Sequence, residues 1–181
     1  MSDLSAAEVV SFWREAGPDH WWKKDDEFDR LIRSKFLELH EAAARGELST
    51  WEESAEGALA LVILLDQFPR NMFRNSPHAF ATDPLAQSVA GRAIARGFDA
   101  AIGQEMGIFF YMPFMHSETL AHQDRCVELM AALPDGGWGE FAVTHRDIIA
   151  KFGRFPHRNP MLGRATTAAE QDFLDAGGFA G

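Results

Sequence analysis

The sequence predicts an all-α protein of about eight helices, and three observations support that fold class. Capping boxes, in which a Ser or Thr is followed three residues later by Glu, stand at residues 5–8, 49–52 and 167–170. Apolar residues recur at the three- and four-residue spacing of a helix over residues 28–39. We see no convincing pair of strand-like segments. We therefore expect one domain over residues 1–181, in which neighbouring helices pack as antiparallel hairpins.

Each expected helix has its own start or stop signal. The apolar run 58–65 would also suit a buried strand, but its helical flanks favour a buried helix that stops at Pro69. Asp25 or Asp26 can cap the long helix that follows, Asp83 is an N-cap followed by a proline, and Ser117 can cap a helix. Gly153 ends the last long helix. In chain order, the expected helices cover residues 5–15, 25–45, the buried run 58–65 preceded by the capping box at 49–52, 83–97, 104–112, 117–133, 138–152 and a short one opening at 167.

Composition and charge exclude several classes of function. The chain has 181 residues, 46% of them hydrophobic and 24% charged, as in an ordinary globular protein. A net charge of -10 argues against nucleic-acid binding and against adhesion to anionic membranes. No apolar run approaches a membrane span, and the N-terminus Met-Ser-Asp-Leu-Ser does not resemble a signal peptide. The single cysteine, Cys126, fits a reducing compartment, so we expect a cytoplasmic protein.

A local basic cluster runs against this acidic composition. Residues 152–164 read Phe-Gly-Arg-Phe-Pro-His-Arg-Asn-Pro-Met-Leu-Gly-Arg and contain no acidic side chain. They hold Arg154, His157, Arg158 and Arg164. Because two glycines and two prolines interrupt the stretch, it is predicted to be a loop that presents its guanidinium groups.

A shorter copy of this pattern lies upstream, where Gln-Phe-Pro-Arg-Asn at 67–71 is followed by Arg74. If both loops face one cleft, their arginines form a site for a small anion, because guanidinium binds phosphate or carboxylate at two points. The predicted ligand contacts are Arg70, Asn71, Arg74, Arg154, His157, Arg158, Asn159 and Arg164. The alternative is structural: these arginines pair with Asp66, Glu118 and Asp124, and the asparagines only form turns.

His116 and Glu118 are the candidate catalytic residues. A histidine can serve as acid or base, and Glu118 can orient it or act as a base itself. Ser117 between them is interpreted as an N-cap rather than a nucleophile, since no nucleophile-elbow motif surrounds it. Cys126 is interpreted as a packed structural thiol.

A metal site is a further alternative, because Glu118 and His122 are four residues apart and His116 and His145 can join them. No His-Glu-x-x-His motif and no cysteine pair supports it. We therefore expect neither metal nor cofactor. The aromatic residues are interpreted as core, although Trp-Trp-Lys-Lys at 21–24 would also suit the wall of a pocket or partner groove.

Several segments together resemble one bacterial family, domain of unknown function 924. They are Phe-Trp at 12–13, Trp-Trp-Lys-Lys-Asp at 21–25, Leu-Leu-Asp-Gln-Phe-Pro-Arg-Asn at 64–71, Phe-Arg at 73–74, Phe-Ala-Thr-Asp-Pro at 80–84, Tyr-Met-Pro-Phe-Met-His-Ser-Glu at 111–118, Gln-Asp at 123–124, Phe-Gly-Arg-Phe-Pro-His-Arg-Asn at 152–159 and Leu-Gly-Arg at 162–164. The resemblance implies an all-helical, tetratricopeptide-like fold and no established reaction. His116, Glu118 and His145 fit the family pattern, whereas His122 falls outside it.

Two functions remain open from the sequence. The first is the binding of a small phosphate or carboxylate ligand in a cleft lined by Arg and His, with acid–base catalysis by His116 and Glu118 as an extension. The second is a tetratricopeptide-like scaffold that binds a protein or a peptide carboxylate, with the Arg and His motifs structural. The sequence indicates neither the reaction nor the oligomeric state, and fold alone would not supply the function.

Overall fold

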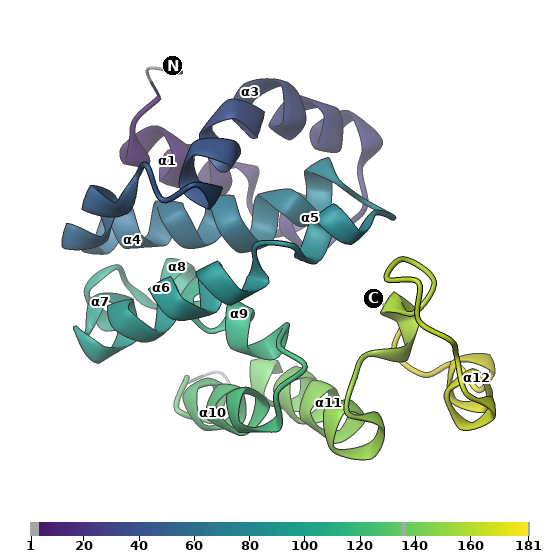
Figure 1. Ribbon diagram of the computed structural model, residues 1–181. Helices are drawn as coiled ribbons and strands as arrows, with labels where there is room; N and C mark the ends of the chain where they lie inside the picture. The colour runs from purple at the N-terminus through teal and green to yellow at the C-terminus, as the bar shows by residue number, and fades with distance from the viewer. Residues whose placement is uncertain (1–3, 135–136, 181) are drawn as a thin grey trace. The chain divides into compact units, whose positions relative to one another are not determined.

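The structure is a computed structural model that describes residues 4–134 and 137–180 (Figure 1). Within those ranges it is all-α, and no strand occurs. The chain divides into two compact units. Of the described residues, 4–74 and 78–113 form unit 1, and 75–77, 114–134 and 137–180 form unit 2. The folding of residues 1–181 as one domain remains a prediction.

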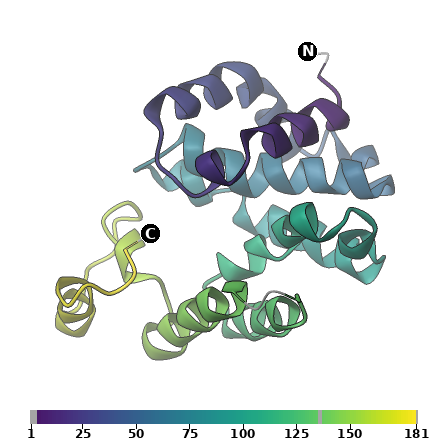
Figure 2. The same ribbon diagram turned by 180° about the vertical axis from the view of Figure 1, so that it is seen from behind.

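Unit 1 is organised around a buried helical segment. Its helices are α1 (Ala6–Ala16), α2 (Pro18–Trp21), α3 (Asp26–Ala44), α4 (Ala55–Val62), α5 (Phe68–Met72), α6 (Asp83–Ala95), α7 (Phe98–Ala101) and α8 (Gln104–Gly107). α4 packs against α1 and α6, and α3 packs against α5, as the ribbon shows from both sides (Figures 1 and 2). All residues from 57 to 69 are buried, which explains why the sequence there is almost continuously apolar.

Two of the predicted N-caps in unit 1 are confirmed. Ser5 and Glu8 form a reciprocal capping box at the start of α1. Asp25 caps α3 by accepting hydrogen bonds from the amides of Glu27 and Phe28 at 2.9 and 3.1 Å. The box predicted at 49–52 is wrong, because Ser49–Glu53 is a 3-10 helix and the hydroxyl of Ser54 caps α4 instead.

The prediction that the buried helix stops at Pro69 is also wrong. A wider π turn, Ile63–Gln67, follows α4 and leads directly into α5. Pro69 lies in the first turn of α5. In a continuous helix a proline cannot donate to a carbonyl of the preceding turn. Here the carbonyls of Leu64 and Leu65 accept instead from Nδ1 of His40 at 2.8 Å and from the hydroxyl of Thr82 at 2.6 Å. The chain therefore stays helical through the conspicuous Phe-Pro pair.

Unit 2 contains α10 (Leu120–Ala131), α11 (Gly137–Phe152), the 3-10 helix Pro156–Arg158 and α12 (Ala168–Asp175). α10 packs against α11, and α12 contacts the 3-10 helix. Part of its core is aromatic, with Ile148, Ile149 and Phe155 buried against the rings of Phe152, Phe173 and Phe179. The predicted capping box at 167–170 is confirmed at the start of α12.

The expected count of about eight helices is not confirmed. The region predicted as one aromatic helix at 104–112 is instead α8, the 3-10 helix Ile108–Phe110 and α9 (Met112–Met115), within which the chain passes from unit 1 to unit 2. In the ranges that the structure describes, no helix combines the length and the apolar character needed to cross a membrane.

Candidate functional site

The basic stretch predicted as a loop forms an irregular segment of unit 2 between α11 and α12. Gly153 ends α11 with a φ of 68°, a left-handed conformation that favours glycine. Phe155 is fully buried and anchors the segment, and the amide of Arg158 donates to its carbonyl at 3.1 Å. Gly163 has a φ of 63° at the far end. The arginines are therefore held on an ordered turn.

Arg154 ties this segment to α12. Its Nε and Nη2 donate to the two carboxylate oxygens of Glu170 at 2.6 and 2.8 Å. Glu170 is buried and also accepts a hydrogen bond from the amide of Thr167 at 2.7 Å. The bonds from Arg154 and then Thr167 lower the pKa of Glu170 to about 2. Arg154 is therefore engaged with a carboxylate of its own unit.

Arg164 makes a second two-point contact, with Glu118. Its Nη1 and Nη2 donate to Oε2 and Oε1 of Glu118 at 2.7 and 3.0 Å, and the amide of Phe155 donates to Oε1 at 2.9 Å. Burial alone would raise the pKa of Glu118, but these hydrogen bonds and the positive charges of Arg164 and Arg158 lower it instead. Glu118 is thus a carboxylate at neutral pH, bound on two sides.

Asn159 links these two ion pairs. The side chain is fully buried, and its Oδ1 accepts a hydrogen bond from Nε of Arg164 at 3.0 Å. Its Nδ2 donates to Oε2 of Glu170 at 3.3 Å. Asn159 is therefore more than a turn former, since its amide connects Arg164 with the Arg154–Glu170 pair.

Two histidines lie beside Arg158, which is itself 7% exposed. His145 and His157 both pack against the rings of Phe155 and Phe179, with centroids 4.5 to 5.6 Å apart. The guanidinium of Arg158 lies over the ring of Phe155, 4.5 Å from its centroid. We call His116, His145, His157, Arg158 and Arg164 the basic cluster.

Burial keeps both histidines neutral. It lowers the pKa of His145 to about 4, although a bond to the carbonyl of Phe141 opposes the shift, and the charges of His116 and Arg158 add to it. The pKa of His157 is likewise lowered to about 4, by burial first and then by Arg158 and His145. The Nδ1 of His145 must donate at 2.7 Å, because a carbonyl can only accept, so Nε2 carries no proton.

His157 carries a buried ring nitrogen that makes no hydrogen bond. Its Nδ1 has no partner among the described residues. Buried polar atoms of this kind are uncommon and call for an explanation, such as a ligand that supplies the missing partner. Two arginines and one carboxylate, Glu118, meet here, so the surroundings carry one net positive charge while the histidines are neutral.

The residues predicted in the first Phe-Pro segment lie in unit 1, and each contacts a carboxylate there. Nη1 and Nη2 of Arg70 both donate at 3.0 Å to the carboxylate of Asp83, and Nη1 lies 3.2 Å from that of Asp66. Arg74 donates two hydrogen bonds to Asp29, at 2.7 and 2.9 Å. Asn71 donates to Asp29 at 2.8 Å. The single cleft between the two segments stays a prediction, because the segments belong to different units.

Ser117 is buried and does not cap α10, whose N-cap position is Thr119. Its Oγ accepts a hydrogen bond from the amide of Thr119 at 3.1 Å and lies 2.9 Å from Nδ1 of His122. Gln123 donates to its carbonyl at 2.6 Å. A serine this deeply buried is poorly placed to attack a substrate.

The thiol of Cys126 and the candidate metal ligands are poorly placed for the roles considered for them. Cys126 is fully buried, and burial raises the pKa of its thiol to about 12, which suits a packed thiol and not a nucleophile. Among the residues that the structure describes, no three His, Cys, Asp or Glu side chains group as metal ligands. The arrangement of His116, Glu118, His122 and His145 therefore offers no ready metal site.

Arg154, His157, Arg158, Asn159 and Arg164, which the sequence pattern grouped, lie together in one segment of unit 2, and their role in binding a ligand stays a prediction. Glu170 was not predicted as part of this set, although the capping box at 167–170 could have indicated it. His145 was considered only as a metal ligand.

The comparisons with known proteins agree on a family. The model of the family described as "Bacterial protein of unknown function (DUF924)" matches residues 9–178. A solved structure of a protein of unknown function from Agrobacterium tumefaciens is similar with a TM-score of 0.91 and 50% sequence identity, over 94% of this chain and 97% of that one. Comparison with curated proteins gives no match. The chain therefore belongs to the DUF924 family of bacterial proteins.

Proposed function

We propose that this protein binds a small anion, the phosphate or carboxylate group of a metabolite, at the basic cluster of unit 2. One observation carries the proposal: the buried Nδ1 of His157 has no hydrogen-bond partner among the described residues, in surroundings with one net positive charge. A phosphate or carboxylate oxygen would accept from this nitrogen once it is protonated. The same oxygen would offset the positive charge of Arg158 and Arg164.

The chemistry of the cluster suits an anion better than a cation or a neutral ligand. Arginine binds planar or tetrahedral anions at two points, and each charge-assisted contact contributes roughly 1.5–3 kcal/mol. Arg164 and His157 are partly exposed, whereas Arg158 and His145 are more deeply buried, so an anion would approach the cluster from the side of Arg164 and His157.

Catalysis is not part of this proposal. Glu118 already accepts three hydrogen bonds, and its pKa is lowered, so it is a poor proton donor and a weak base near pH 7. An acid–base pair of His116 and Glu118 remains a prediction. The proposal includes a cytoplasmic location, because phosphorylated and carboxylated metabolites occur there.

The proposal is tested by calorimetric titration of the purified protein with sulfate, inorganic phosphate and citrate. We expect saturable binding of at least one of them by the wild type and a loss of at least tenfold in affinity in His157→Gln and in Arg158→Gln. Arg125→Gln is the matched control, since it removes the same charge from an exposed arginine of unit 2 whose ion-pair partner among the described residues is Glu128. If none of the three anions binds, or if Arg125→Gln weakens binding as much, the proposal is wrong.

The second candidate function is a scaffold that binds a protein partner, on a tetratricopeptide-like fold with structural Arg and His motifs. The observation that favours it is that Arg70, Arg74 and Arg154 each make two-point contacts with a carboxylate of their own unit. Such arginines stabilise the fold and leave ligand recognition to another surface.

A further inference from the structure

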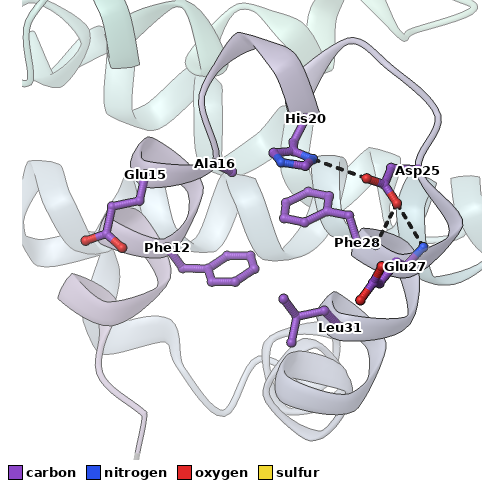
Figure 3. A pocket seen from close by; sticks show the side chains of 8 residues that line it. All are labelled: Phe12, Glu15, Ala16, His20, Asp25, Glu27, Phe28 and Leu31. Atoms are coloured by element: carbon purple, nitrogen blue, oxygen red, sulfur yellow. Dashed lines mark hydrogen bonds and ion pairs between the residues drawn. The ribbon is translucent and has the colours of Figure 1, made fainter.

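A groove on unit 1 shares no residue with the basic cluster of unit 2. It lies where α1, α2 and the first turns of α3 meet, and its volume is about 450 Å³ (Figure 3). Its floor is apolar and consists of Phe12, Ala16, Phe28 and Leu31. Grooves of several hundred Å³ with an apolar floor and a few polar groups at the edge are the usual form of binding sites.

The floor of the groove contains stacked rings and is partly uncovered. The rings of Phe12 and Phe28 are nearly parallel, with an angle of 3° and centroids 5.7 Å apart. His20 stacks on Phe28 at 4.5 Å. Leu31 is 48% exposed although it belongs to the groove. A partner that covered Leu31 and the ring of Phe12 would remove apolar surface from water, which favours association.

The edge of the groove carries Glu15, Asp25 and Glu27. Asp25 is already occupied, because it caps α3 and lies 3.6 Å from Nδ1 of His20. Glu15 and Glu27, in contrast, form no ion pair with any residue that the structure describes. Figure 3 shows them on α1 and α3, on either side of the apolar floor.

This pattern is distinctive because the neighbouring acidic residues are paired. Asp19 contacts Lys23 at 2.7 Å, and Asp26 contacts Lys24 at 3.3 Å. Asp29 accepts the two hydrogen bonds of Arg74. Between residues 15 and 29, Glu15 and Glu27 are thus the carboxylates without such partners, although unpaired carboxylates such as Glu56 also occur elsewhere in the described part of unit 1. Lys35 lies near, but its ammonium is placed over the rings of Phe12 and Phe36, at 5.1 and 5.3 Å.

We propose that this groove docks a short basic segment of a partner protein, in which an apolar side chain covers Leu31 and Phe12 and flanking Lys or Arg side chains contact Glu15 and Glu27. Charge complementarity selects this occupant, since two unpaired carboxylates on opposite sides suit two basic side chains of one chain. An extended segment also suits the exposure of Leu31, because a small ligand is usually enclosed by its site. The net charge of -10 attracts such a segment from a distance.

The test measures fluorescence anisotropy of a labelled, amidated tetrapeptide, Lys-Leu-Phe-Lys, titrated with the full-length protein. We expect weak but saturable binding that raised salt reduces. Glu15→Gln combined with Glu27→Gln is expected to weaken it roughly threefold to tenfold, the range of two exposed ion pairs. Leu31→Ser is expected to weaken it as well.

A matched control removes the same charge elsewhere on unit 1. Glu56→Gln combined with Glu105→Gln alters two exposed carboxylates outside the groove and should leave the affinity within twofold. The peptides Glu-Leu-Phe-Glu and Lys-Ser-Ser-Lys are expected to bind at least threefold more weakly than Lys-Leu-Phe-Lys. Circular dichroism establishes that each variant is folded before its affinity is compared.

Three outcomes overturn the proposal. They are no saturable binding of Lys-Leu-Phe-Lys, an equal loss of affinity in the control and groove variants, and equal binding of phenethylamine, which would make the groove a small-molecule site. Failure here is distinguishable from failure of the anion proposal, because the groove lies in unit 1 and sulfate is expected neither to compete with the peptide nor to require Glu15 or Glu27.

Discussion

Arg164 and Glu118 form a two-point ion pair between residues 46 positions apart, with both N–O distances at or below 3.0 Å. The pair joins the end of the basic segment to the residues just before α10, and the amide of Phe155 donates to the same carboxylate. The pair thereby stabilises the fold of unit 2. Because Arg164 and Glu118 neutralise each other, the neighbouring Arg158 supplies the one net positive charge of the basic cluster.

We predict that Glu118→Gln destabilises unit 2 by about 1–3 kcal/mol, because it removes charge-assisted bonds from a partly buried site. Arg164→Lys keeps the charge but loses the two-point geometry, so it should cost about 1 kcal/mol. The measurement is the rate at which a thiol reagent labels Cys126, the single cysteine, which is buried in unit 2 and reacts when that unit opens.

Glu128→Gln is the control for this experiment, since Glu128 forms an exposed pair with Arg125 in the same unit. Its effect should stay within about 0.5 kcal/mol. Labelling of Glu118→Gln at the wild-type rate would show that the pair does not hold unit 2 together.

Arg70→Ala is predicted to be the more damaging change in unit 1. It leaves the fully buried carboxylate of Asp66 and the nearly buried one of Asp83 without the guanidinium that both contact. Removing one partner of a buried pair costs roughly 3–5 kcal/mol. Urea unfolding followed by circular dichroism measures the loss. Arg92→Ala, which breaks the exposed pair with Glu52, should cost about 1 kcal/mol or less, and equal losses would contradict the prediction.

The stability of the protein should fall as the pH drops from about 6.5 toward 4, the range set by His145 and His157. Their folded pKa values, about 4, lie below the ordinary value, so the unfolded chain takes up protons first. The contribution of the neutral histidines to the free energy of unfolding is therefore fully present above pH 6.5 and is lost as the pH falls below it. The loss is roughly 1–3 kcal/mol for each histidine. Urea unfolding at pH 7.5, 6.0 and 5.0 measures the slope.

His157→Gln should flatten this slope, because it removes one of the two histidines with a lowered pKa. The carboxylates with lowered pKa values, Glu118 and Glu170, lose their contribution at lower pH and contribute little in this window. An unchanged slope in His157→Gln would mean that its ring is not kept neutral by the fold.

The fold was predictable where the signal is local. The caps at Ser5, Asp25 and Thr167 are correct because side chain and amide lie within three residues of each other. The prediction that the helix stops at Pro69 was wrong because the effect of this proline depends on the π turn before it. That turn lies in a buried segment, and no local sequence motif predicts it. The region around Ile108 was misread for a similar reason, since continuous apolar residues fit several short helices as well as one.

The site was predictable in part. The basic residues of 152–164 lie close in sequence, so the pattern identified them together. The carboxylate partners of these arginines could not be predicted, because they lie far away along the chain. Glu118 is 46 positions from Arg164, and Glu170 is 16 positions from Arg154. Burial is likewise a tertiary property, so the neutral state of His145 and His157 could not be predicted from residue type.

If the basic cluster binds an anion, that binding should take up protons. A bound sulfate next to His157 would favour the charged imidazolium and return its pKa from about 4 toward the ordinary value. Sulfate is the suitable probe, because it stays a dianion between pH 5 and 8, whereas phosphate changes charge in that range. If the bound pKa reaches about 6.5, the affinity for sulfate is roughly tenfold higher at pH 5.5 than at pH 7.5.

Calorimetry in two buffers of different ionisation enthalpy measures the protons taken up, and we expect uptake to rise as the pH falls toward 5.5. His157→Gln should bind sulfate with a weaker dependence on pH, since it removes one of the two histidines whose pKa burial lowers to about 4. Arg158→Gln should lower the affinity at both pH values, because its guanidinium is charged throughout. Equal affinity of the wild type at pH 5.5 and 7.5 would show that the anion does not contact the histidines, because a dianion in contact with His157 must raise the pKa of that side chain.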